Sequence, residues 1–146
     1  MELIEFDADR LARLSRQCGQ VRDLFASLMQ YLPALAEDDF PVKGITARLA
    51  DDRECIHVQY RSIGIDLVLT QLRVDGTSKG KVTAMLVKHP LLAKPHSLGS
   101  FTFDRTGITD LQNTGDFDTA IGSLGVPVVM TFLEKAVYLD AVPAQS

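Results

Sequence analysis

The chain has 146 residues, 46 % hydrophobic and 23 % charged, which indicates a single domain over residues 1–146 and excludes a disordered chain. Its formal net charge of −4 gives no overall attraction to nucleic acid or to an anionic membrane, and no apolar stretch is long enough to span a bilayer. The two cysteines are too few for a disulfide framework, and the acidic N-terminus lacks the features of a signal peptide, so we expect a cytoplasmic protein.

A helix is expected first, over residues 6–35. Apolar residues recur there in alternating steps of three and four, which is the spacing of one helical face and also of a heptad repeat. The series consists of Leu11, Leu14, Cys18, Val21, Phe25, Leu28, Leu32 and Leu35. Asp7 or Asp9 is a candidate N-cap, and Pro33 is expected to end the helix.

The first half of this helix predicts a contact between two copies of the chain. Its apolar stripe is narrow, as in helix–helix packing, whereas the second half is wide enough to pack on a sheet. A helix of about 25 residues is roughly 37 Å long and exceeds strands of roughly 17–20 Å, so part of it should project. The predicted dimer interface consists of Leu11, Leu14, Cys18, Gly19 and Val21, with Gly19 allowing close approach of another backbone. The same spacing is also compatible with packing inside one chain.

Residues 43–112 have the pattern of an antiparallel sheet with five or six strands. Runs of alternating apolar residues are separated by short polar turns, which is typical of a meander. In one run the odd-numbered residues from Ile63 to Leu69 are apolar, and the change of phase that follows predicts a bulge near residues 70–71.

A helical segment is expected at the C-terminus, over residues 117–140. Pro127 is tolerated there if it lies in the first turn of a helix. The predicted fold is therefore α+β: a long N-terminal helix, a meander sheet, and a C-terminal helix packed on one face of that sheet.

Three polar residues are candidates for a pocket between sheet and helices. His57, Tyr60 and Asp66 would supply its polar groups. Cys55 and His57 share a strand face and could form a zinc pair or a nucleophile with its base. However, neighbours on one strand stand parallel, and a zinc site would need His89 or His96 to converge from a distant loop. We therefore predict no catalytic residue, no metal site and no cofactor.

A basic segment lies between Asp75 and Asp104, where no acidic residue occurs. Its lysines could contact the phosphates of a nucleic acid; they are Lys79, Lys81, Lys88 and Lys94. The segment contains no arginine, and its phenylalanines are expected to face the core, so a solvated lysine face is the better interpretation. In the loop KHPLLAKPH, Leu91 and Leu92 either enter the core or form an exposed apolar tip.

These patterns together predict a non-enzymatic, adaptor-like or chaperone-like protein that binds other proteins as a homodimer. The order helix, antiparallel sheet, helix in a small acidic chain is similar to type III secretion chaperones, which dimerise and bind extended effector segments. The similarity concerns architecture and charge and carries over no residue. Two alternatives stay open: a small-molecule-binding or enzymatic domain, and nucleic-acid binding through the lysines.

Overall fold

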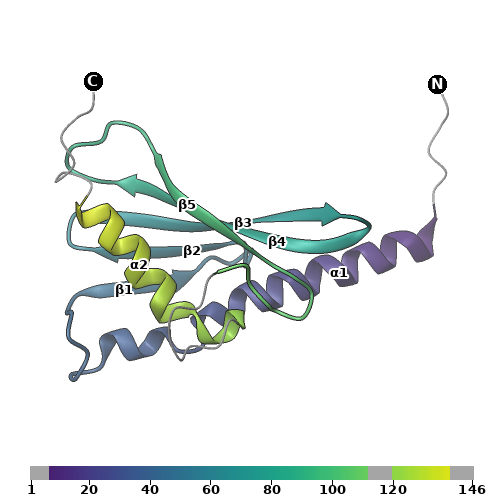
Figure 1. The fold of residues 1–146 in the computed structure, drawn as a ribbon, viewed down its shortest axis with the longest axis horizontal. Coiled ribbons are helices and arrows are strands. Elements are labelled where there is room, and N and C mark those ends of the chain that lie inside the picture. The colour runs from purple at the N-terminus through teal and green to yellow at the C-terminus, as the bar shows by residue number, and fades with distance from the viewer. Residues whose placement is uncertain (1–6, 112–119, 139–146) are drawn as a thin grey trace.

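The computed structural model describes residues 7–111 and 120–138, and it has the expected α+β fold (Figure 1). The α-helices are α1 (Ala8–Ala26) and α2 (Gly125–Val137). The five strands are β1 (Ile45–Leu49), β2 (Cys55–Tyr60), β3 (Ile63–Val74), β4 (Thr77–Lys88) and β5 (His96–Phe103). Three short 3₁₀ helices are η1 (Ser27–Met29), η2 (Leu32–Ala36) and η3 (Ile121–Ser123).

The sheet is an antiparallel meander in the order β1-β2-β3-β4-β5, so each strand pairs with its neighbours in sequence. Two of its turns contain only two residues: 61–62 joins β2 to β3, and 75–76 joins β3 to β4. Asp75 and Gly76 have φ angles of 52° and 77°. Positive φ at both positions is what a type I′ hairpin turn requires, and Asp-Gly is a preferred sequence for it. These short turns fix the registers of the long strands.

Both α-helices pack on the same face of the sheet. α1 contacts β3 and β4, and α2 contacts β3 and β5. The sheet residues beneath them are buried and alternate along each strand; they include Ile56, Val58, Ile65, Leu67, Val82, Ala84, Leu86 and Phe101. Among the described residues no helix covers the opposite side of β2, β3 and β4, which we call the open face.

α1 is shorter than the helix predicted over residues 6–35. It ends at Ala26, and the chain continues as η1 and η2. The Ser27 hydroxyl donates to the carbonyl oxygen of Leu24, a local bond that competes with continuation of the α-helix. Pro33, in the first turn of η2, favours a new start there because it lacks an N–H group. The apolar stripe nevertheless stays in the core, since Leu28, Leu32 and Leu35 are buried.

The predicted bulge near residues 70–71 is absent. β3 and β4 stay in register beyond Ile65, and their register shifts between Gly64 and Ile65 instead. The apolar alternation stops after Leu69 because the core ends there. Gln71, two residues on, donates from its side-chain amide to a backbone carbonyl of α1 rather than packing in the core.

α2 lies within the segment predicted as helical, residues 117–140, of which 117–119 and 139–140 lie outside the described residues. Pro127 lies in its first turn, as expected. A Cβ added to Gly125 would lie 2.1 Å from the carbonyl oxygen of Leu28, so only glycine permits this close approach of α2 to η1. Within the described residues no helix is long and apolar enough to cross a membrane.

Candidate functional site

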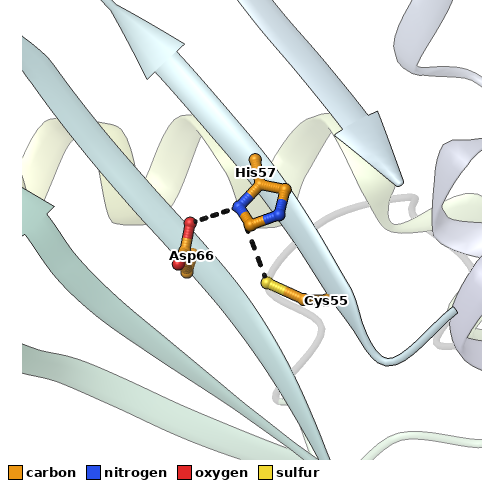
Figure 2. Close-up of side chains that lie close together, drawn as sticks. All are labelled: Cys55, His57 and Asp66. Atoms are coloured by element: carbon orange, nitrogen blue, oxygen red, sulfur yellow. Dashed lines mark hydrogen bonds and ion pairs between the residues drawn. The ribbon is translucent and has the colours of Figure 1, made fainter. Parts of the chain in front are cut away.

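Three side chains with ligand atoms meet on the open face: Cys55 and His57 from β2, and Asp66 from β3 (Figure 2). His57 Nδ1 lies 2.7 Å from Asp66 Oδ1 and 3.8 Å from Cys55 Sγ. All three ligand atoms lie within 4.8 Å of one another. The side chains of His57 and Asp66 are 39 % and 26 % exposed, so the cluster can be reached from solvent.

The register of the β2–β3 hairpin brings these residues together. Cys55 and His57 are two positions apart on β2, so their side chains leave the same face of the strand. Asp66 is the direct cross-strand partner of His57. Because the turn at residues 61–62 has only two residues, this pairing follows from the hairpin itself.

The environment of the cluster keeps the Cys55 thiol protonated. Burial, and then the negative charges of Asp66 and Asp52, raise the pKa of this thiol from 9.0 to about 11, while Arg48 acts in the opposite direction. A reactive cysteine has a lowered pKa, because the thiolate is the nucleophile. Cys55 without a bound cation is therefore not an activated nucleophile.

The hydrogen-bond geometry also differs from that of a nucleophilic triad. In a triad the histidine contacts the nucleophile through one ring nitrogen and the carboxylate through the other. Here both Asp66 Oδ1 and Cys55 Sγ lie against the same nitrogen, Nδ1 of His57. Three ligand atoms that converge on one point resemble the inner shell of a metal ion more closely than a proton relay.

The predicted pocket between sheet and helices is not formed by its three candidate residues. His57 and Asp66 lie together, but on the open face. Tyr60 is half-buried at the end of β2, where the Arg61 guanidinium carbon lies 5.3 Å from the centre of its ring. The face beneath the helices is filled by the hydrophobic core. A small cavity of about 240 Å³ between η2 and β1 is lined mainly by apolar side chains.

The residues predicted for a dimer interface lie in three environments along α1. Leu11 and Leu14 are 47 % and 42 % exposed. Cys18 and Gly19 are half-buried, and Val21 is 1 % exposed. Val21 therefore belongs to the core of its own chain and has no surface to offer a partner. A Cβ added to Gly19 would meet no atom within 4 Å, so no backbone of this chain approaches it closely.

The four lysines of the basic segment are spread along the molecule. Lys79 and Lys81 are half-buried near one end of β4, and Lys88 lies at its other end. Lys81 and Lys88 are seven positions apart, or about 23 Å along a strand. Lys94 is exposed in the loop after β4. Together they do not form one compact patch.

The loop KHPLLAKPH is ordered by its first histidine. His89 is buried, and its Nδ1 accepts a hydrogen bond from the backbone N–H of Leu91. The Leu91 side chain is 70 % exposed, whereas Leu92 packs against the core. Leu91 is therefore an exposed apolar residue of the loop, and Leu92 anchors the loop to the core. His96 is exposed at the start of β5.

No family model matches the chain, and comparisons with curated proteins and with solved structures find no similar protein. From the sequence, Cys55 with His57 formed one candidate pair, and His57 with Tyr60 and Asp66 were candidate polar groups of a pocket. The full cluster was missed because the cross-strand register was not worked out. The two-residue turn at 61–62, combined with the alternation of β2 and β3, carried that information.

Proposed function

We propose that this protein is a non-enzymatic, protein-binding homodimer of the cytoplasm, joined through the first half of α1. The observation that carries the proposal is an apolar helix stripe that continues beyond the core. Leu11 and Leu14 continue the heptad series of Val21 and Phe25, yet the first pair is exposed and the second pair is buried.

Among the described residues, two hydrogen bonds link α1 to the sheet, and both are made near the middle of the helix. Gln17 Oε1 accepts a hydrogen bond from the Ser78 hydroxyl at 3.1 Å, and the Cys18 carbonyl accepts one from the Gln71 amide at 3.2 Å. Every described residue before Gln17 is exposed. In Figure 1 the start of α1 extends past the turn between β3 and β4. Residues 8–16 thus form a projecting segment about 14 Å long.

A second copy of the chain is the occupant that this stripe fits best. A helix of this length is marginal in water without tertiary packing, so a partner helix would stabilise it. Another copy presents the same narrow stripe, and a two-fold axis makes the contact self-complementary. In an antiparallel pair, Leu11 of each copy would lie opposite the partner's Leu14.

The two faces of the sheet support a binding role rather than an enzymatic one. The helix-covered face is filled by its own side chains, which leaves no enclosed polar site there among the described residues. The Cys55 thiol is neither ionised nor placed across the histidine ring from the carboxylate. The open face remains available for a partner in each copy of the dimer.

Sedimentation equilibrium tests the proposal. We expect a dimer for the wild type and a folded monomer for the double variant Leu11→Glu, Leu14→Glu, with at least about a tenfold weaker self-association. The matched control is Ala12→Glu, Gln20→Glu, which adds the same charge at exposed positions of the same helix and should stay dimeric. Circular dichroism checks that all three chains are folded.

A monomeric wild type would refute the dimer. A dimer that persists in the leucine variant would place the interface elsewhere and refute the role of α1. If both double variants dissociate equally, added charge rather than the stripe is responsible, which also contradicts the proposal.

A further inference from the structure

The cluster on the open face combines a thiol, an imidazole and a carboxylate in one small volume. Within the described residues, Cys55, His57 and Asp66 are the group of ligand-type side chains whose ligand atoms converge. We propose that these three residues bind one divalent cation of tetrahedral preference, with Zn²⁺ as the best match. The inference concerns a different face from the α1 interface and does not depend on the dimer.

The two distances from His57 Nδ1 fit a tetrahedral ion after a small adjustment, and the ligand atoms of Cys55 and Asp66 lie within 4.8 Å of each other. With zinc bonds of about 2.0–2.3 Å, tetrahedral ligands lie about 3.3 Å apart for nitrogen and oxygen and about 3.6 Å apart for sulfur and nitrogen. The structure has 2.7 Å between His57 Nδ1 and Asp66 Oδ1, and 3.8 Å between His57 Nδ1 and Cys55 Sγ. The carboxylate oxygen must therefore retreat by about 0.6 Å, which a side-chain rotation of Asp66 provides without moving either strand.

The charges also match a dication. With Cys55 as thiolate, Asp66 as carboxylate and His57 as neutral imidazole, the three ligands carry two negative charges. Binding breaks the S–H bond and releases that proton to solvent, while sulfur forms the bond to the metal. In the metal-free protein His57 Nδ1–H donates to the Asp66 carboxylate. Binding of the metal through Nδ1 therefore requires the other neutral tautomer, so the Nδ1 proton is lost to solvent and one proton is taken up from solvent at Nε2. No electron transfer is involved.

The ligand types select the class of metal. Ca²⁺ and Mg²⁺ are bound by oxygen ligands, so a thiol and an imidazole do not favour them. One sulfur, one nitrogen and one oxygen suit Zn²⁺ and its spectroscopic substitute Co²⁺. Three protein ligands on a solvent-accessible face leave the fourth position to water or to a group from a bound partner.

Cobalt titration of the 146-residue chain tests the site directly, in the presence of a reductant that does not bind metals. We expect one equivalent of Co²⁺ to produce the absorption bands of a tetrahedral thiolate complex, and Zn²⁺ to abolish them by displacement. Competition with a chromophoric chelator then gives the zinc affinity of each variant.

The chain offers a matched control, because Cys18 on α1 is its other cysteine and is also a half-buried free thiol. Cys55→Ser should abolish the thiolate band, and Cys18→Ser should leave it unchanged. His57→Gln and Asp66→Asn should each weaken zinc binding by more than about tenfold. Circular dichroism without metal shows whether each variant is folded.

Three results would overturn the site. The first is the absence of a tetrahedral cobalt spectrum in the folded wild type. The second is a spectrum that Cys18→Ser abolishes and Cys55→Ser retains. The third is zinc affinity that is unchanged in both His57→Gln and Asp66→Asn, because the cluster would then be only a hydrogen-bonded group of surface side chains.

Discussion

A glycine opposite a buried aromatic ring gives the sharpest test of the packing of the sheet. Gly80 on β4 is the direct cross-strand partner of Phe103 on β5. The ring of Phe103 covers this glycine and is itself 1 % exposed. A Cβ added to Gly80 would lie 2.2 Å from Cζ and 2.4 Å from Cε1 of the ring. Because ordinary contacts begin at 3.4 Å, the end of the ring would have to move by more than 1 Å.

We expect Gly80→Ala to lower the free energy of unfolding by about 2 kcal/mol. Overpacking of a dense core costs about 1–3 kcal/mol, and the gain of about 0.5–1 kcal/mol from replacing a strand glycine offsets only part of this cost. Phe103→Leu alone should cost about 1–2 kcal/mol by loss of buried surface. The shorter leucine leaves room for the new methyl group, so the double variant should be only about as unstable as Phe103→Leu.

The measurement is urea denaturation followed by circular dichroism, since the chain contains no tryptophan. The four proteins form a double-mutant cycle with an expected coupling energy of about 2 kcal/mol. If the two effects add to within about 0.5 kcal/mol, the ring does not lie over Gly80 in solution and the reasoning fails. A change in the slope of the denaturation curve would indicate an altered unfolded state instead.

Four further predictions concern other parts of the fold. Gly125→Ala should destabilise by about 3 kcal/mol in the same denaturation assay, because the carbonyl oxygen of Leu28 that it meets is backbone and cannot rotate away. Gly19→Ala should instead stabilise α1 by about 1 kcal/mol, and a weaker dimer in sedimentation would show that a partner approaches this glycine closely. Asp7→Ala removes the N-cap that accepts from the N–H groups of Asp9 and Arg10, and should cost about 1 kcal/mol in thermal melts. Asp104→Ala should cost about 1 kcal/mol at neutral pH. The Thr106 hydroxyl, and then backbone N–H groups, hold the pKa of Asp104 below its usual 3.8. The carboxylate therefore stabilises the fold above that value, and the difference from wild type should shrink as the pH falls below 3.8 through the lower folded pKa. A difference that is constant down to acid pH would contradict this role.

The sheet was predictable because its signals are local. Alternation of apolar residues marks each strand, and short polar turns between strands favour a meander, whereas the strand order itself came from the structure. The extent of a turn is harder to read from the sequence: the polar run from Asp75 to Gly80 contains a turn of only two residues, and the other four belong to β4. Local polarity alone overestimates the length of such a loop.

The N-terminal helix was predicted with the right face but the wrong length. Leu28, Leu32 and Leu35 keep the helical spacing and are buried, although the chain is there in 3₁₀ turns. Apolar spacing reports which side chains enter the core, and it does not distinguish one continuous α-helix from a series of shorter turns. The heptad series also does not show where core ends and free surface begins, because that depends on how far the β3–β4 hairpin reaches.

The Cys55, His57 and Asp66 cluster was only partly predictable. Periodicity placed Cys55 and His57 on one face, and it also placed Asp66 opposite the apolar face of β3. Two facts of tertiary structure were missing: the pairing of His57 with Asp66, and the absence of a helix over that side of the sheet. His57 and Asp66 were therefore assigned, with Tyr60, to a pocket between sheet and helices, whereas His57 and Asp66 lie with Cys55 on the open face.

The contact between η1 and α2 has a consequence for folding kinetics. The sheet pairs only neighbouring strands, so hairpins can close early at low entropic cost. The contact between Leu28 and Gly125 joins segments that are far apart in sequence and brings η1 and α2 together over the core. We therefore expect that docking of these two segments follows formation of the β3–β4 hairpin. Gly125→Ala should then act mainly by accelerating unfolding, with little effect on the folding rate.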